Sequence, residues 1–288
     1  MYLLSICIPT FNRKNDLKKM LDSIIADNKV EVVICDDGSN DNTEELVKKY
    51  YNKLNIKYIF QKNSGVSAAM VTAYNNATGK YVIKMDSDDL FTEDGLEFIL
   101  RTLSENLEQI AFLFGVKTIK KHVRSKNIPP NGLINFISVY ADHKIKGDLK
   151  QVVRRTIVLE YIYHVPNNVR RIPPGLLWTK IAEDYKCLSF AKAVAIKNYL
   201  DDGITSKILF LNASYPAALV ELNQRLVDSQ VYKSCLYRWR SRLLWSRYSF
   251  HNNSIRLKSW WHWLVFIPGL FIYFIDSIRL IKVKKSRR

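Results

Sequence analysis

Three polar clusters, each following an apolar run, dominate the first ninety residues of this 288-residue chain. SICIPTFNR covers residues 5–13, CDDGSND covers 35–41 and MDSDD covers 85–89. In open parallel α/β sheets, ligands bind just beyond the carboxyl ends of the strands. Carboxylates gathered there hold a divalent cation or accept hydrogen bonds from a ligand. This feature predicts an α/β sheet with its chemistry at one edge.

Strand-like and helix-like patterns alternate from residue 3 to residue 116 and then weaken. Apolar runs predict strands at 3–8, 30–35, 56–60, 81–85 and 110–116. Helical spacing predicts helices at 15–25, 41–53, 67–77 and after Thr92, with Asp41 and Glu44 as a capping box and Thr92 as a cap. This order predicts a largely parallel sheet with helices on both faces. Residues 138–163 and 178–185 are expected to be helical in part, and the chain is expected to be helical again from 219.

The positive charge of the chain is concentrated in its tail. The net charge is +17, and residues 233–288 hold 13 Lys/Arg and one acid, which leaves only +5 for the first 232 residues. A basic tail attracts anionic surfaces, either phospholipid or nucleic acid. The four cysteines lie far apart without a CxxC pair, and no basic leader precedes the first strand. We therefore expect reduced, mostly buried thiols, no signal peptide and a cytosolic protein.

Asp86 and Asp88 stand two residues apart at the end of the fourth predicted strand. Side chains at this spacing point the same way in an extended backbone, so one or both could reach a single metal ion. An oxygen-rich site without histidine favours Mg²⁺ or Mn²⁺, ions that bridge to diphosphate. Asp89 is expected to turn away and cap the next segment. The alternative is a polar turn before a helix.

Two further polar groups follow the second and first strands. Asp36 and Asp37 precede Gly38, which permits a tight turn, and their carboxylates could accept hydrogen bonds from a base or a ribose. The alternative is an ordinary Asp-Gly turn. After the first strand, Thr10, Asn12 and Arg13 could contact a nucleotide, although Thr10 could equally be a turn residue and Arg13 a solvated charge.

In this order and at these spacings, the motifs resemble those of the family 2 glycosyltransferases, which have the GT-A fold. The matching motifs are PTFN at 9–12, DDGS at 36–39, NSG at 63–65, GKY at 79–81 and DSDD at 86–89. They cover roughly the first 115 residues. The resemblance implies a Rossmann-like, mostly parallel sheet flanked by helices, and a hexosyltransferase-type activity. It also implies a nucleotide-diphosphate sugar as donor, most often UDP-linked.

The resemblance also implies roles for single residues. Asp36 or Asp37 would recognise the uracil or ribose, Asp86 would bind near the ribose or sugar, and Asp88 would coordinate Mn²⁺ or Mg²⁺. The expected metal ligands are Asp86 and Asp88. The expected donor-binding residues are Pro9, Thr10, Asn12, Arg13, Asp36, Asp37, Asn63, Gly65 and Asp86. The family mostly inverts the anomeric carbon, and inversion by one displacement needs a general base.

The chain departs from the family pattern at two places. The arginine that often follows N-x-G is replaced by Met70, and no acid stands directly before Leu176, where the family usually places its base. Asp148, Glu183 and Asp184 are the candidate bases, and each could equally be a surface charge.

The second half suggests the acceptor. GDLKQVVRR at 147–155 and YLDDGIT at 199–205 resemble acceptor-domain motifs of bacterial family members. They favour surface polysaccharide or O-antigen assembly, with a saccharide or an undecaprenyl-diphosphate-linked saccharide as acceptor. We predict a nucleotide-sugar-binding half at 1–118, an acceptor-binding half at 119–218 and a helical tail at 219–288.

The tail has the composition of a membrane contact. The apolar stretch at 260–275 is shorter than the roughly 20 residues of a spanning helix, and residues 235–250 mix Trp and Arg as interfacial helices do. We predict a monotopic contact with the cytoplasmic face of a bacterial inner membrane. A re-entrant hairpin at Pro268-Gly269, or aromatics that pack on the catalytic part, are the alternatives.

Three other classes compete with the transferase. A nucleic-acid-binding protein would suit the basic tail, but the acidic motifs would repel phosphates, so we expect no nucleic-acid partner. A dinucleotide oxidoreductase would need G-x-G-x-x-G where PTFNR stands. A catalytically silent scaffold stays open because of Met70 and the missing acid.

Overall fold

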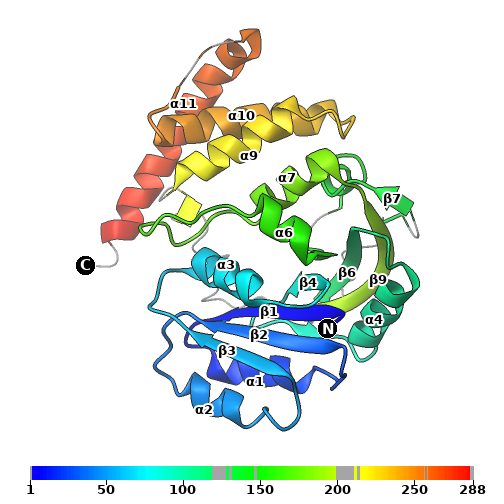
Figure 1. The fold of residues 1–288 in the computed structure, drawn as a ribbon. Coiled ribbons are helices and arrows are strands. Elements are labelled where there is room, and N and C mark those ends of the chain that lie inside the picture. Colours follow the sequence, from blue (N-terminus) through cyan, green and yellow to red (C-terminus); the bar gives the residue numbers. More distant parts are fainter. Residues whose placement is uncertain are drawn as a thin grey trace.

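The computed structural model describes residues 2–118, 128–129, 132–145, 148–198, 211–212, 215–255, 257 and 259–285 (Figure 1). Within these residues, nine strands form one sheet in the order β3-β2-β1-β4-β8-β6-β9-β5, and β7 pairs with β9. The strands are β1 Leu4–Thr10, β2 Val30–Asp36, β3 Ile56–Phe60, β4 Tyr81–Lys84, β5 Leu90–Phe91, β6 Ala111–Thr118, β7 Gly132–Ile134, β8 Lys150–Arg154 and β9 Cys187–Lys197.

The predicted α/β class is confirmed, and the sheet is mixed rather than largely parallel. Strands β1, β2, β3 and β4 run parallel, as predicted, and they are neighbours in the order β3-β2-β1-β4. Strand β6 does not continue this parallel run, because β8 lies between β4 and β6 and is antiparallel to both. Residues 150–154 were expected to be helical in part. Only Val152 and Val153 are apolar in this segment, so the sequence shows no clear helical or strand period. Hydrogen bonds to β4 on one side and β6 on the other make it a strand.

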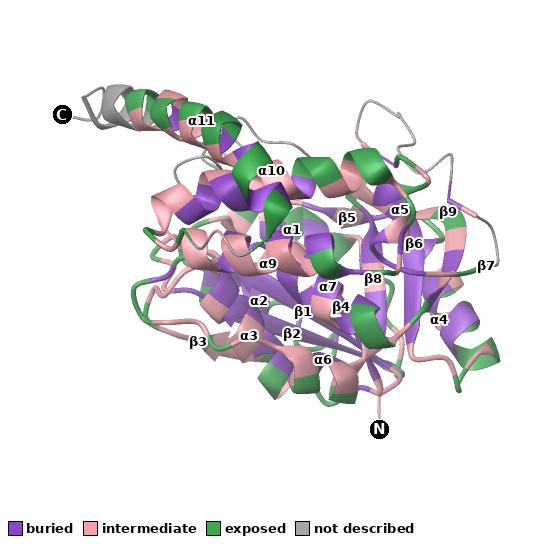
Figure 2. Ribbon diagram, turned by 90° about the horizontal axis from the view of Figure 1, so that it is seen from above, coloured by how far each residue is buried: buried purple, intermediate pink, exposed green. Residues whose placement is uncertain are grey.

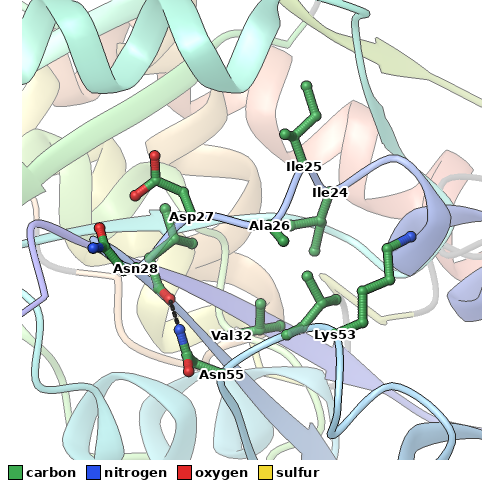
Figure 3. Close-up of a pocket in the computed structure, with 10 residues that line it drawn as sticks. Ile24, Ile25, Ala26, Asp27, Asn28, Val32, Lys53 and Asn55 are labelled. Carbon is green, nitrogen blue, oxygen red and sulfur yellow. Dashed lines mark hydrogen bonds between the residues drawn. The ribbon is translucent and has the colours of Figure 1, made fainter.

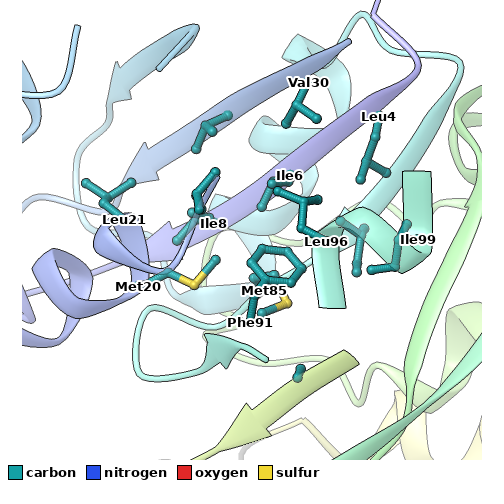
Figure 4. Packing of buried hydrophobic residues seen from close by; sticks show 14 of the residues in the cluster. Leu4, Ile6, Ile8, Met20, Leu21, Val30, Met85, Phe91, Leu96 and Ile99 are labelled. Atoms are coloured by element: carbon teal, nitrogen blue, oxygen red, sulfur yellow. The ribbon is translucent and has the colours of Figure 1, made fainter. Parts of the chain in front are cut away.

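The two faces of the sheet carry separate cores. Helices α1 Lys14–Asp22, α2 Thr43–Lys48 and α4 Gly95–Glu105 cover one face, where Ile6 and Ile8 of β1 pack with Leu21 and Leu96 (Figure 4). Helices α3 Val66–Asn76, α5 Ser138–Ala141 and α7 Gly175–Asp184 cover the other face, to which Cys7 belongs. Helix α6 Arg155–Tyr161 lies beside α3 and α7 (Figure 1). The alternation along β1 follows from the period of two in strands.

Both predicted helix caps are wrong, because tertiary contacts take the side chains. The Asp41 carboxylate accepts the backbone N–H of Lys14 at 2.9 Å, at the start of α1, and Asn42 is the N-cap of α2. The Thr92 hydroxyl donates to the carbonyl of Ala193 at 3.1 Å, and Asp94 is the N-cap of α4.

The tail is helical, as predicted. Helices α9 Pro216–Asp228, α10 Cys235–His251 and α11 Trp260–Lys285 stack beyond α6 and α7 (Figure 1). Within the described residues, α11 is the one helix long and apolar enough to cross a membrane, over residues 260–279. Cys7, Cys35 and Cys187 are buried free thiols, as expected, whereas Cys235 is exposed.

Candidate active site

The PTFN and DDGS motifs meet at the carboxyl ends of β1 and β2. The two strands are in parallel register, with Thr10 opposite Asp36. Beyond them, the backbone N–H of Asn12 donates to the Ser39 hydroxyl at 2.8 Å, and the N–H of Asn40 donates to Asn12 Oδ1 at 2.9 Å. The sequence prediction that both motifs lie at one edge of the sheet is confirmed.

Asp36 braces the DDGS turn from inside. Its side chain is 1% exposed, and its two oxygens accept the N–H of Ser39 and the Tyr58 hydroxyl, each at 2.7 Å. Burial and this hydrogen bond to Asp36 raise the pKa of Tyr58, so the phenol stays a donor.

Asp37 holds the NSG loop against β2. Its carboxylate accepts Gln61 Nε2 at 2.7 Å, the N–H of Ser64 at 2.8 Å and the N–H of Gly65 at 2.7 Å. The side chain is 3% exposed. Asp36 and Asp37 thus both organise the loops of this edge, a role that their place in a turn motif did not reveal.

A segment of the second half, residues 170–174, crosses the NSG loop, and we call it the strap. The Arg170 guanidinium donates to the carbonyl of Asn63 at 2.7 Å, and the Ser67 hydroxyl accepts the N–H of Ile172 at 2.7 Å. Gly65 has a φ of +96°, and a Cβ there would lie 2.3 Å from the Arg170 carbonyl oxygen. Only glycine fits this close approach without strain.

Three carboxylates form a cluster after β4. One oxygen each of Asp86, Asp88 and Asp89 lies within 4.8 Å of the others. Asp89 was expected to turn away as a cap, but it is fully buried inside the cluster. Its Oδ1 has no hydrogen-bond partner among the described residues. Hard divalent cations take carboxylate oxygens, so the cluster fits Mn²⁺ or Mg²⁺.

Three lysines that the sequence prediction missed surround the cluster. Lys84 Nζ lies 2.7 Å from Asp86, and Lys150 Nζ lies 2.7 Å from Asp89. Lys197 Nζ lies 3.1 Å from Asp86 and 3.9 Å from Asp89. Lys150 and Lys197 come from β8 and β9, two strands that the sequence pattern did not predict.

Burial and neighbouring charges shift the pKa of Asp86 and of Lys197 in opposite directions, whereas at Asp88 burial and the neighbouring carboxylates act in the same direction. Burial opposes ionisation of Asp86, but the charges of Lys84, Lys197 and Lys150 outweigh it and hold its pKa well below the usual range. Burial and the neighbouring carboxylates Asp86 and Asp89 raise the pKa of Asp88 to about 6. Burial lowers the pKa of Lys197, and the surrounding carboxylates more than reverse this. The ammonium of Lys197 is therefore a fixed positive charge in the site.

Of the three candidate bases, one pairs with a lysine of the cluster and two have partners elsewhere. Asp148 Oδ2 lies 3.1 Å from Lys197 Nζ, the group that also contacts Asp86. Glu183 and Asp184 lie at the C-terminal end of α7, where Glu183 pairs with Arg225 at 2.7 Å and Asp184 accepts the Tyr161 hydroxyl at 2.7 Å.

The remaining predicted donor residues sit around the first strand. Pro9 is buried in β1, and Thr10 is 3% exposed with its hydroxyl unpartnered among the described residues. Arg13 lies 3.8 Å from Asp16, with a side chain 28% exposed. Met70, which replaces the usual arginine, is buried in the core on the α3 face.

Of the two segments likened to acceptor motifs, only one is described. Residues 150–154 form β8 and Arg155 begins α6, which brings Lys150 to Asp89, and Asp148, just before β8, pairs with Lys197. Residues 199–205 lie outside the described residues.

A cavity of about 250 Å³ lies between the chain after α1 and the start of β2 (Figure 3). Ile24, Asp27, Val32 and Lys53 are among its lining residues. Since β2 begins there, the cavity is at the opposite end of the strand from Asp36 and is separate from the acidic cluster.

Comparison with known proteins agrees with this geometry. The model of the family described as "Glycosyl transferase family 2" matches residues 5–149, half of the chain. The chain belongs to this family. It is 38% identical over 111 residues to glycosyltransferase GlyA of Streptococcus pneumoniae, and 33% identical over 134 residues to a chondroitin synthase of Escherichia coli. These matches cover 38% and 45% of this chain but only 16% and 19% of those relatives.

Solved structures extend the likeness to nearly the whole chain. Residues 1–349 of S. aureus TarS in complex with UDP-GlcNAc superpose with a TM-score of 0.67, at 18% identity, over 96% of this chain and 81% of that chain. The Pyrobaculum calidifontis mannosyltransferase PcManGT, with GDP-Man and Mn²⁺, superposes with a TM-score of 0.56, at 18% identity, over 99% and 84%. The chain of this family 2 member thus has the GT-A fold.

Proposed function

We propose that this glycosyltransferase moves a sugar from a UDP-sugar, with the help of Mn²⁺ or Mg²⁺, to a saccharide acceptor. The observation that carries the proposal is the cluster of Asp86, Asp88 and Asp89 beside the loops built by Asp36 and Asp37. The UDP-GlcNAc bound to the TarS fragment supports UDP as the nucleotide, because that structure superposes with a TM-score of 0.67, against 0.56 for PcManGT with GDP-Man.

In this proposal Asp86 and Asp88 hold the ion. When bound, it neutralises charge that develops on the nucleoside diphosphate as the glycosidic bond breaks. Pro9, Thr10, Asn12, Arg13, Asp36, Asp37, Asn63 and Gly65 form the nucleotide side of the site. Thr10, whose hydroxyl is buried and unpartnered among the described residues, ends β1 beside these loops.

We place the general base at Asp148, rather than at Glu183 or Asp184. Its carboxylate is half-exposed and shares Lys197 with Asp86, so it lies within reach of the sugar end of a donor held there. It would take the proton of the acceptor hydroxyl as that oxygen attacks the anomeric carbon, with inversion. Glu183 and Asp184 are engaged with Arg225 and Tyr161.

The acceptor is proposed to be a growing surface polysaccharide or O-antigen, carried on undecaprenyl diphosphate at the cytoplasmic face of a bacterial inner membrane. Two features support this: the named relatives include polysaccharide synthases, and α11 carries an apolar, basic sequence. The acceptor half is proposed at 119–218 and the membrane-associating tail at 219–288.

A catalytically silent scaffold is the second candidate. One observation favours it: Pro173 and Pro174 of the strap directly precede α7, where the family usually places its acid. A silent protein would still bind UDP but would transfer nothing.

A transfer assay separates the two. The full chain is incubated with Mn²⁺, membrane lipid extract and, in turn, UDP-GlcNAc, UDP-Glc, UDP-Gal and GDP-Man, and release of nucleoside diphosphate is measured. Acceptor-dependent release with a UDP-sugar, absent in Asp88→Asn, supports the proposal. Absence of release with all four donors, from protein that binds UDP, would favour the scaffold.

A further inference from the structure

Helix α11 presents one continuous apolar face to solvent. Its exposed large apolar side chains are Trp260, Trp263, Leu264, Ile267, Phe271, Phe274 and Ile278, from 55% to 74% exposed. They recur at spacings of three and four residues, so they lie on one side of the helix over roughly 27 Å. We call them the α11 stripe. Figure 2 shows exposed residues along this helix.

The opposite side of α11 is fixed to α10. The rings of Trp261 and Trp245 pack edge to face at 5.3 Å, and a Cβ on Gly269 would lie 2.1 Å from Ser246 Oγ. Near the end of the helix, the buried Asp276 accepts two hydrogen bonds from Arg247 of α10, at 2.6 and 2.8 Å. The stripe is therefore held outward by packing on α10 from Trp261 to Asp276.

This packing decides between crossing a bilayer and lying on it. A spanning α11 would take α10 into the hydrocarbon with it, and α10 carries Arg238, Arg240, Arg242 and Arg247. Each charge in the bilayer centre is costly. A helix that lies in the interface buries the stripe and keeps the arginines of α10 out of the hydrocarbon.

Charge identifies the kind of surface. Arg279 is exposed at the end of the stripe, and residues 279–288 contain six Lys/Arg and no acid. At the other end, the Arg242 guanidinium lies 5.5 Å from the Trp260 ring and 4.8 Å from the Trp239 ring, both exposed. Apolar side chains bordered by cations and tryptophans suit the interface of an anionic bilayer.

We propose that the α11 stripe docks the enzyme on an anionic phospholipid bilayer, with α11 in the plane of the interface rather than across the membrane. The benefit of this docking to the enzyme rests on the proposed membrane-side acceptor, but binding of the stripe to a bilayer needs neither the sugar donor nor the metal ion. Failure of this proposal is therefore distinguishable from failure of the proposed transferase.

The first test is flotation of the full chain with vesicles of phosphatidylcholine and phosphatidylglycerol at 7:3, and with pure phosphatidylcholine. We expect binding to the anionic vesicles, and at least tenfold weaker binding by the double variant Ile267→Glu/Phe271→Glu. The matched control Ile25→Glu/Leu133→Glu adds the same charge at exposed apolar positions outside the tail and should bind like the wild type. Equal binding by both double variants would overturn the proposal. So would sedimentation without lipid that shows a dimer of the wild type which Ile267→Glu/Phe271→Glu abolishes, because the stripe would then join two copies.

The second test measures depth. In a Cys235→Ser background, which removes the one exposed thiol among the described cysteines, a spin label is attached at position 264, 271 or 278 through Leu264→Cys, Phe271→Cys or Ile278→Cys. An in-plane helix gives three similar depths, because the positions are two turns apart on one face. A spanning helix separates the outer two by roughly 21 Å along the bilayer normal. That result would overturn the in-plane arrangement.

Discussion

Replacing Asp37 by asparagine is expected to destabilise the nucleotide-free protein by about 3 kcal/mol. The carboxylate accepts three N–H groups, from Gln61, Ser64 and Gly65, while 3% exposed. Hydrogen bonds to a charged acceptor contribute about 1.5–3 kcal/mol each, and those to a neutral one about half as much. In asparagine, the amide oxygen can still accept from Gln61 and Ser64, but the amide NH₂ takes the place of the second carboxylate oxygen. Two donors, this NH₂ and the N–H of Gly65, would then face each other.

Urea unfolding, followed by tryptophan fluorescence without nucleotide, measures this loss. The control is Asp16→Asn, which removes only ion pairs of 3.8 Å on an outer helix and should change the free energy by less than about 0.5 kcal/mol. In a protein of this size, 3 kcal/mol lowers the melting temperature by roughly 6–12 °C. If Asp37→Asn unfolds like the control, Asp37 does not brace the loop and the reasoning is refuted.

Three further changes test other contacts of the site. Lys197→Met removes a cation that competes with a metal ion for Asp86, so the Mn²⁺ affinity of the nucleotide-free protein should rise about tenfold. Electron paramagnetic resonance measures this affinity. The control Lys192→Met, which removes an ion pair with Asp94 outside the cluster, should leave the affinity unchanged. Asp148→Asn should lower kcat by about 100-fold with UDP affinity unchanged, and Glu183→Gln by less than about twofold; the reverse order would move the base to α7. Gly65→Ala should lower the unfolding free energy by at least about 1–2 kcal/mol in urea titrations, and a wild-type midpoint would contradict the close approach of the strap.

The first half of the fold could be predicted because its central strands β1 and β2 are covered on both faces. Residues 30–36 are buried throughout and apolar except for Glu31, until Asp36 ends the run at the carboxyl end of the strand. The parallel direction of β1 to β4 followed from this pattern and the helices between the strands, whereas their order in the sheet was not predicted.

The second half resisted the same reasoning because its strands are defined by pairing rather than by pattern. Lys150 begins β8 and Lys197 ends β9, and both are charged residues placed in the interior by the carboxylates they meet. The sequence alone does not show which carboxylates these two lysines meet. The buried place of Asp89 was missed for this reason, since its ion pair with Lys150 joins residues 61 apart.

Local signals also failed where distant segments compete for a side chain. Asp41 and Glu44 have the spacing of a capping box, but Asp41 serves the start of α1 and Glu44 pairs with Lys48. The bracing roles of Asp36 and Asp37 depend on Tyr58 and Gln61 of the next strand and loop, which the DDGS motif does not contain.

The most direct test of the account is calorimetric titration of the full chain with UDP, in Mn²⁺ and in EDTA, for the wild type, Asp88→Asn and Asp148→Asn. We predict that UDP binds at least tenfold more tightly with Mn²⁺, that Asp88→Asn abolishes this difference and that Asp148→Asn keeps it. Equal UDP affinity in Mn²⁺ and in EDTA, or a metal effect that survives in Asp88→Asn, would contradict a donor site built on the acidic cluster.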